Sequence, residues 1–278
     1  MNKVKDSYIQ RNILRKKNEY QAAILQDNIL SSKQLDEVIK MHQSTVWHVP
    51  YSWNLGEDVL EWNKIIEYTD ILPDYYEEII DVSVKKKELD SYLSIREFNK
   101  DYVFNKEIFS NILYDAFGRF SNYPSKGYPS AGGLYPVIPI VYIFDEVTIE
   151  GVSKGVYVYD STEMQLLMIK DLSNSDSFQS VTNNINSVSP GEVLSNIAFG
   201  YALDMKRATT KYKRRGYRHG LIEVGLMAQS LRESIFNQRA MLGDVSWSGF
   251  NDNALSHASG LNARISPIIL IQWIGKKI

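Results

Sequence analysis

The chain contains no cysteine, and this absence excludes several kinds of functional site. Thiol nucleophiles, disulfides, thiolate zinc sites and cysteine-ligated iron–sulfur clusters are all ruled out. Only four histidines occur in 278 residues, and none forms an HExxH motif or a comparable pattern with carboxylates. No serine lies in a GxSxG context. We therefore expect no bound metal and no serine or cysteine nucleophile.

The chain also lacks a strong net charge and a long apolar run. Its 31 basic and 33 acidic residues leave a net charge of −2, which does not favour nucleic-acid binding. No apolar segment approaches the roughly 20 residues of a membrane-spanning helix. The first 30 residues are charged and lack the apolar centre of a signal peptide. We expect a soluble cytoplasmic protein without a nucleic-acid or membrane partner.

The remaining composition is that of a globular protein rich in aromatic residues. Hydrophobic residues make up 44% of the chain and charged residues 23%, so one large domain with an appendage can bury a substantial core. The 18 tyrosines mildly favour a protein that stacks on flat rings or handles peptides.

The first third of the chain is predicted to be helical and then irregular. Apolar residues recur at helical spacing from Asp6 to about Lys40, and Ser31-Ser32 interrupts the run and can cap a second helix. Met41–Trp62 is predicted to be an exposed loop that could contact a partner, and the charged stretch Lys85–Asp90 a connector. We place a domain boundary there, with an N-terminal helical extension over 1–87 and the main domain over 88–278.

The main domain is predicted to mix helices and strands, which indicates an α+β fold. Asn105 is a candidate N-cap of a helix that Gly118 ends. Pro139 should mark an edge or an irregular point of its strand. The predicted elements are a helix from Glu88 to Arg96, an irregular loop over Arg119–Pro136, a strand over Val137–Phe144, a hairpin of Gly155–Tyr159 with Met164–Ile169, a mobile loop over Asp171–Pro190, a strand over Val193–Leu203 with a helical segment as the alternative, the longest helix over Gly216–Ala240 and a strand over Ser266–Ile274.

The loop Pro129–Pro136 is the first candidate site. Its small residues Ser130, Ala131, Gly132 and Gly133 would let backbone approach a flat or anionic ligand closely. The loop is neither a Walker phosphate loop nor a GxGxxG turn. An ordinary tight turn that leads into a strand explains the same composition.

A hydroxyl and a guanidinium form a second candidate. Ser94 and Arg96 lie two residues apart near a predicted helix end, where they could share a phosphate. Taken alone, Arg96 is also compatible with a solvated surface arginine.

The segment Lys211–Arg218 is the sharpest feature of the sequence. If it is extended, Lys211 and Lys213 point to one side and Tyr212 to the other. Adjacent lysine and tyrosine side chains offer a proton-transfer pair, because a nearby ammonium favours the phenolate. A solvated basic loop is the alternative. Glu223, in the apolar helix that follows, is interpreted as a paired structural carboxylate or as a partner of this basic segment.

These motifs, in this order, resemble the SagB/McbC-type flavin dehydrogenases, which are nitroreductase-like enzymes of thiazole/oxazole-modified peptide biosynthesis. The resemblance extends over roughly Val38–Gly275. It is carried by Met41-His42-Gln43-Ser44-Thr45, Ser94-Ile95-Arg96-Glu97-Phe98, Pro129-Ser130-Ala131-Gly132-Gly133-Leu134-Tyr135-Pro136, Gly155-Val156-Tyr157-Val158-Tyr159-Asp160, Lys211-Tyr212, Arg215-Gly216-Tyr217-Arg218, Leu221-Ile222-Glu223-Val224-Gly225 with Gln229, and Gly249-Phe250-Asn251-Asp252.

The resemblance implies a nitroreductase-like α+β fold, with a mixed, mostly antiparallel central sheet between helices, and a homodimer that binds FMN at its interface. The reaction implied is the oxidation of peptide thiazolines or oxazolines to azoles, on a precursor peptide prepared by a partner cyclodehydratase. Lys211 and Tyr212 would be the catalytic pair. The implied flavin-binding residues are Ser94, Arg96, Pro129, Ser130, Ala131, Gly132, Gly249 and Phe250.

Two positions depart from the family pattern. Tyr92 stands where nitroreductases usually carry a further arginine, so another base, for which Arg264 is a candidate, would have to contact the phosphate. Met41 replaces a usual tyrosine. Two other functions stay open: an NAD(P)H-dependent nitroreductase-like oxidoreductase for small molecules, and a docking subunit of a cyclodehydratase complex without flavin.

Overall fold

An antiparallel sheet of seven strands forms the centre of the computed structural model, which describes residues 2–47, 57–66, 69–82, 93–119, 125–187, 193–238 and 241–278. The strand order is β1-β7-β5-β2-β3-β4, and β6 also pairs with β7. The strands are β1 (Phe98–Asn99), β2 (Val137–Ile143), β3 (Gly155–Asp160), β4 (Gln165–Asp171), β5 (Ile197–Leu203), β6 (Leu242–Trp247) and β7 (Ile268–Lys277).

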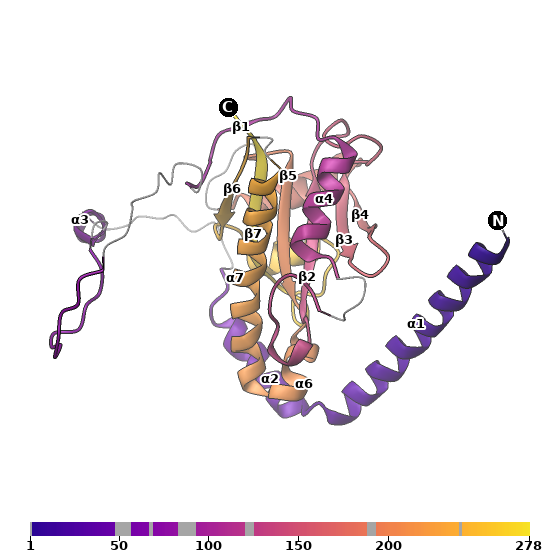
Figure 1. The fold of residues 1–278 in the computed structure, drawn as a ribbon, viewed down its shortest axis with the longest axis horizontal. Helices are drawn as coiled ribbons and strands as arrows, with labels where there is room; N and C mark the ends of the chain where they lie inside the picture. The colour runs from indigo at the N-terminus through magenta and orange to yellow at the C-terminus, as the bar shows by residue number, and fades with distance from the viewer. Residues whose placement is uncertain are drawn as a thin grey trace.

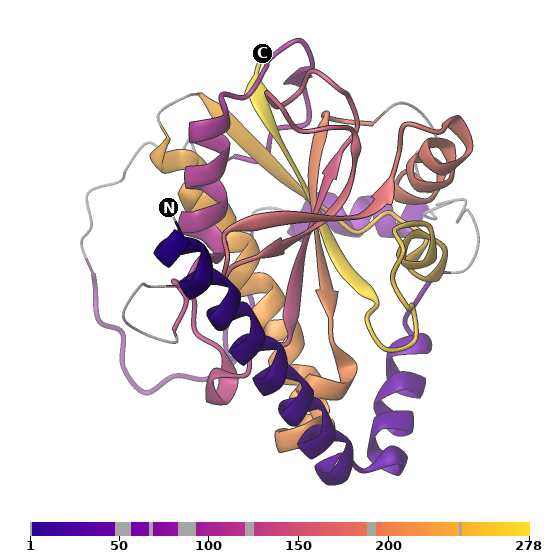
Figure 2. The same ribbon diagram turned by 90° about the vertical axis from the view of Figure 1, so that its right-hand side faces the viewer.

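Helices flank both faces of this sheet, which Figure 2 shows nearly edge-on. The helices α4 and α7 cover one face, and α5 and α8 cover the other. The helix bounds are α1 (Asn2–Ile29), α2 (Ser32–Gln43), α3 (Glu57–Ile66), α4 (Lys106–Phe117), α5 (Ser175–Ile185), α6 (Met205–Tyr212), α7 (Arg214–Asn237) and α8 (Asp252–Ala258). No helix in the described part of the chain is long and apolar enough to cross a membrane.

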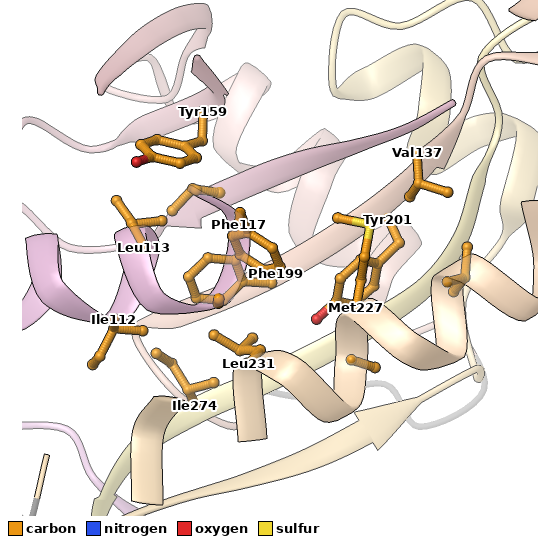
Figure 3. Packing of buried hydrophobic residues seen from close by; sticks show 14 of the residues in the cluster. Ile112, Leu113, Phe117, Val137, Tyr159, Phe199, Tyr201, Met227, Leu231 and Ile274 are labelled. Atoms are coloured by element: carbon orange, nitrogen blue, oxygen red, sulfur yellow. The ribbon is translucent and has the colours of Figure 1, made fainter. Parts of the chain in front are cut away.

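The larger core lies under α4 and α7. Phe199 and Tyr201 are two residues apart on β5 and therefore point to the same face of the sheet, where Phe117, Met227 and Leu231 pack against them (Figure 3). All five side chains are essentially inaccessible to solvent. Burial of such a side chain contributes about 1.5–3 kcal/mol to folding, so this cluster fixes α7 on the sheet.

Several local signals in the sequence are confirmed. The Ser31 hydroxyl accepts from the Gln34 N–H at the start of α2, and Asn105 caps α4, which ends before Gly118. The β3–β4 hairpin forms where it was predicted. Pro139 does not lie on an edge strand, because β2 lies between β5 and β3 and Pro139 pairs with Tyr201 of β5; on the β3 side it lies one residue outside the paired stretch.

Other predictions are wrong, each for a physical reason. Part of the predicted loop Asp171–Pro190 is the helix α5, because Asn174 caps it and the buried face of α5 needs few apolar residues. Within Met41–Trp62, predicted to be irregular, residues 41–43 end α2 and residues 57–62 begin α3. The described end of the helix predicted over Glu88–Arg96 is not helical, since the Ile95 N–H donates across to the Asp244 carbonyl. The predicted boundary near residue 88 lies outside the described residues.

Two parts of the chain carry exposed apolar side chains. The helix α1, at 28 residues longer than the 24-residue α7, projects beside the β3–β4 hairpin, where Arg15 pairs with Asp160 at 2.7 Å (Figure 1). The helix α3 stands clear of the sheet, and residues 69–82 continue from it without regular structure. This arm, residues 57–66 and 69–82, buries no large apolar side chain among its described residues.

Candidate active site

The loop Pro129–Pro136 and the end of α6 meet at Gly132. A Cβ atom on Gly132 would lie 2.5 Å from the Tyr212 Oη and 2.7 Å from the Lys211 Nζ. Its φ of +63° is a second reason for glycine at this position. The two predicted catalytic groups therefore converge over the predicted flavin loop, although more than 75 residues of sequence separate them.

Lys211 and Tyr212 lie at the end of the helix α6 and not in an extended segment. Asp204 caps α6 by accepting from the Arg207 N–H at 2.9 Å, so the chain turns into a helix directly after β5. In this helix Lys211 and Tyr212 are adjacent residues whose functional atoms nevertheless reach the same point. The Lys211 Nζ lies 5.2 Å from the centre of the Tyr212 ring.

A sharp corner after Tyr212 positions the pair. Lys213 joins α6 to α7 with a φ of +55° and a ψ of −138°, a conformation that a residue with a side chain rarely adopts. Gly216 lets the two helices touch, because a Cβ there would lie 1.8 Å from the Ala208 carbonyl oxygen. Arg207 ties α6 to the loop by donating to the Leu134 carbonyl at 2.5 Å.

Ser130 links the loop to α7. Its hydroxyl donates to the Glu223 Oε2 at 2.5 Å and accepts from the Tyr135 N–H at 2.9 Å. Glu223 is only 2% exposed, and burial raises its pKa although the Ser130 hydrogen bond lowers it. The Ser130 hydroxyl is thus used within the chain, which leaves the backbone and small side chains of the loop to face a ligand.

A histidine that the sequence did not mark as functional lies beside Tyr212. The ring of His219 meets the Tyr212 ring edge to face, with the centroids 4.8 Å apart. His219 precedes Glu223 by four residues on α7, so the two side chains share one face of the helix. That spacing was the signal available in the sequence.

A buried lysine, Lys126, also lies next to the loop. Lys126 is 8% exposed, and burial together with repulsion from Arg119 lowers its pKa to about 8. Its ammonium lies 5.7 Å from the centre of the Tyr128 ring and 5.5 Å from that of Tyr135. Burial raises the pKa of Tyr128.

The other predicted flavin residues lie elsewhere in the chain. Ser94 and Arg96 are exposed next to β1, which pairs with Lys276 and Lys277 at the end of β7. The helix α6 begins near the opposite end of β7, where Ala202 pairs with Ile268. The ten residues of β7 span about 30 Å, and Figure 1 shows β1 and α6 at opposite ends of the sheet.

Gly249 and Phe250 follow β6. The Phe250 ring is 2% exposed and packs in the core under α5 and α8, so only the backbone of this turn is available to a ligand. The Gly249 carbonyl accepts from the Ser187 hydroxyl at 3.4 Å. Arg264, the candidate phosphate ligand, pairs instead with Asp36 at 3.0 Å.

Two hollows lie outside this cluster. One of about 600 Å³ opens at the start of α7 and is lined by Met41, Arg214, Arg215, Tyr217, Arg218 and Leu221. A hollow of about 680 Å³ lies between α4 and the β3–β4 hairpin and contains none of the predicted site residues. Among the described residues, no group of three or more histidines and carboxylates could hold a metal ion.

The loop fits one side of a flat cofactor. Nothing lies within 4 Å of the position of a Cβ on Gly133, so the space beside Gly133 is open. The Lys211 Nζ and the Tyr212 Oη border the same backbone at Gly132. The loop can therefore present backbone to a ring while a proton-transfer pair stands at the ring's edge.

Comparisons with known proteins support the fold and the resemblance. No protein-family model matches the chain. It is 29% identical over 210 residues, 74% of this chain and 96% of the relative, to MJ1384 of Methanocaldococcus jannaschii, whose given name proposes a nitroreductase. It is 28% identical over 149 residues to the microcin B17-processing protein McbC of Escherichia coli, and the match spans 53% of each chain.

Solved structures agree on the architecture. A chain of the E. coli microcin synthetase McbBCD complex with truncated pro-MccB17 bound superposes with a TM-score of 0.75 at 21% identity, over 91% of this chain and 96% of that one. A nitroreductase-type structure from Ralstonia eutropha gives a TM-score of 0.52 at 19% identity, over 72% and 88%. The predicted nitroreductase-like fold with its N-terminal helical extension is confirmed.

Proposed function

We propose that this nitroreductase-like protein of the McbC/SagB type is an FMN-dependent dehydrogenase that oxidises peptide thiazolines or oxazolines to thiazoles or oxazoles. Its similarity to McbC and to a McbBCD chain supports the coarser statement that it is an oxidoreductase related to microcin synthesis. The observation that carries the finer proposal is the convergence of Lys211 and Tyr212 on the loop at Gly132.

In this proposal the chain's own groups move a proton while FMN, when bound, accepts a hydride from the azoline ring. Lys211 or Tyr212 removes the ring proton, because both side chains end at the loop that borders the flavin. The loop residues Pro129, Ser130, Ala131 and Gly132 hold the flavin ring through backbone and small side chains. Position and proton transfer are the contribution of the protein.

We further propose that two copies of the chain complete each flavin site. Ser94 and Arg96 lie about 30 Å along β7 from the Lys211–Tyr212 end, too far to contact the same flavin within one copy. In a homodimer, Ser94 and Arg96 of one copy hold the phosphate, and the loop of the other copy holds the ring. The backbone of Gly249 and Phe250 completes the ring site.

The exposed arm supports a second copy. Monomeric proteins seldom expose long runs of large apolar side chains. The arm exposes many of them, at Val59, Leu60, Trp62, Ile65, Ile71, Leu72, Tyr75, Tyr76, Ile79, Ile80 and Val82. We propose that the arm wraps the second copy, and that a cyclodehydratase complex delivers the precursor peptide to the dimer.

The test compares purified wild type with Lys211→Ala and Tyr212→Phe. All three are expected to show flavin absorption and to release FMN on denaturation, but only wild type should convert an azoline peptide to the azole. Wild-type azole formation in either variant would contradict the assigned roles. A protein that refuses added FMN yet binds a cyclodehydratase would instead favour the docking subunit.

The similarity to MJ1384 favours a second candidate, an NAD(P)H-dependent oxidoreductase for small molecules. Rapid bleaching of the flavin by NADH or NADPH, with reoxidation by a nitroaromatic compound, would support it. Slow bleaching by both nucleotides together with azole formation would support the dehydrogenase.

A further inference from the structure

Three polar groups behind Tyr212 line a small cavity. Its lining includes Tyr212 from α6, His219 and Glu223 from α7, and Ser130 from the loop. The Glu223 Oε1 and the His219 Nδ1 are buried atoms that have no hydrogen-bond partner among the described residues. A buried carboxylate oxygen and a buried imidazole nitrogen without partners are each costly, typically by about 1–3 kcal/mol. Both unpartnered atoms lie on one face of α7 beside Tyr212, so we look for a single group that satisfies both.

One water molecule meets the requirements of this cavity. The cavity offers about 10 Å³ to the centre of a water-sized molecule, which is room for one. A buried water needs two to four polar partners, and the Glu223 Oε1 and the His219 Nδ1 supply two.

The surroundings of Glu223 suit a carboxylate that takes up and releases a proton. The charged and titratable groups that face Glu223 are Lys126, Arg207, Tyr128, Tyr212 and His219. Lys126 and Arg207 attract its carboxylate electrostatically, and its hydrogen-bond donors are the Ser130 hydroxyl at Oε2 and the Val137 N–H. Burial raises the pKa of Glu223, although the hydrogen bonds from Ser130 and the Val137 N–H lower it, and a raised pKa makes the carboxylate a better proton acceptor.

We propose that Glu223 is the proton acceptor behind the Lys211–Tyr212 pair, reached through one water that His219 positions. The proposal rests on the proposed dehydrogenase function. The azoline loses a hydride to the flavin and a proton to Tyr212 or Lys211. That proton passes through the water to the Glu223 carboxylate, which becomes the acid. Molecular oxygen, the terminal oxidant, would then take the hydride equivalent held by FMN together with the proton held by Glu223 and leave as hydrogen peroxide, which returns Glu223 to the carboxylate. Glu223 and His219 act through Tyr212 and are positioning residues.

The first test measures azole formation against pH in wild type, Glu223→Gln and His219→Asn. Glu223→Gln keeps the hydrogen bond from Ser130 but cannot accept a proton, so kcat is expected to fall about 100-fold with little change in KM. The rise of kcat with pH in the wild-type profile should disappear in this variant. The control is Glu233→Gln, which removes the same charge from the exposed face of the same helix.

Chemical rescue separates a relay from a structural role. Glu223→Ala opens space beside the water. Added formate is expected to raise the rate of azole formation by Glu223→Ala at least 10-fold and to leave the rate of Lys211→Ala unchanged. Lack of rescue together with an unchanged pH profile in Glu223→Gln would overturn the proposal.

A second measurement needs no catalysis. The pKa of Glu223 is raised in the folded chain, so as the pH rises above about 4.5 the unfolded chain loses the Glu223 proton at a lower pH than the folded chain does. The wild-type free energy of unfolding should therefore fall with pH in this range relative to that of Glu223→Gln, in flavin-free protein. Parallel curves for the two proteins would refute a proton on Glu223. If azole formation is absent altogether, the dehydrogenase function fails, and the unfolding curves still decide the state of Glu223.

Discussion

The contact between Gly132 and the Lys211–Tyr212 pair makes a sharp prediction for Gly132→Ala. The added methyl group would lie 2.5 Å from the Tyr212 Oη and 2.7 Å from the Lys211 Nζ, and ordinary contacts begin at 3.4 Å. Both groups must therefore retreat by about 1 Å. Misplacement by that amount can reduce catalysis about 100-fold. Under the proposed dehydrogenase function, we expect azole formation to fall by this factor while added FMN still binds.

Gly133→Ala is the matched control. Gly133 has almost the same backbone, with a φ of +65°, but nothing lies within 4 Å of the added methyl group. Each substitution should lower stability by about 1–2 kcal/mol, because a residue with a Cβ is strained in the left-handed region. For a chain of this size, that is a fall in Tm of about 2–4 °C per kcal/mol.

The assay is therefore a pair of measurements on each variant, Tm by calorimetry and azole formation by mass spectrometry. The reasoning predicts similar losses of Tm and a much larger loss of rate in Gly132→Ala. Equal rates in the two variants would refute the assignment of Lys211 and Tyr212 to the site at Gly132.

Two further predictions concern stability. Arg232→Ala should destabilise the protein by about 3 kcal/mol in urea unfolding, because it removes the bidentate partner, at 2.9 Å, of the buried Asp244 carboxylate. Arg264→Ala, at the exposed pair with Asp36, should cost less than about 1 kcal/mol. Equal costs would contradict the difference in burial. Lys126→Met should remove a pH dependence: since the pKa of Lys126 is lowered to about 8 in the folded chain, the unfolded chain binds more protons between pH 8 and 10.5, and the wild-type free energy of unfolding should rise with pH there relative to the variant. Parallel curves would show that Lys126 titrates normally.

Local signals explain how much of the fold was predictable. Caps such as Ser31 and Asn105, and the turn between β3 and β4, act within a few residues and can be recognised from the sequence alone. The helix α5 was missed because three side chains, Phe178, Val181 and Ile185, suffice to hold its polar sequence on the sheet. The cap at Asp204 was a readable signal for α6 that the basic character of Lys211–Arg218 obscured.

The site was predictable only in its separate pieces. The loop and the Lys211–Tyr212 pair were identified as motifs, but their meeting at Gly132 depends on how α6 folds back from β5. The role proposed for His219 and Glu223 depends on a cavity that three segments enclose, which no spacing along the chain reveals. The separation of Ser94 and Arg96 from the loop likewise emerges only from the register of β7.

The conformation of Lys213 has a consequence for evolution and for engineering. A side chain at its φ of +55° and ψ of −138° costs about 1–3 kcal/mol, and glycine would relieve that strain. Lys213→Gly is therefore an easy route to a more stable protein. It would also loosen the turn that directs Tyr212 toward the loop. Under the proposed function, selection for thermostability alone would therefore favour a more stable protein with slower turnover.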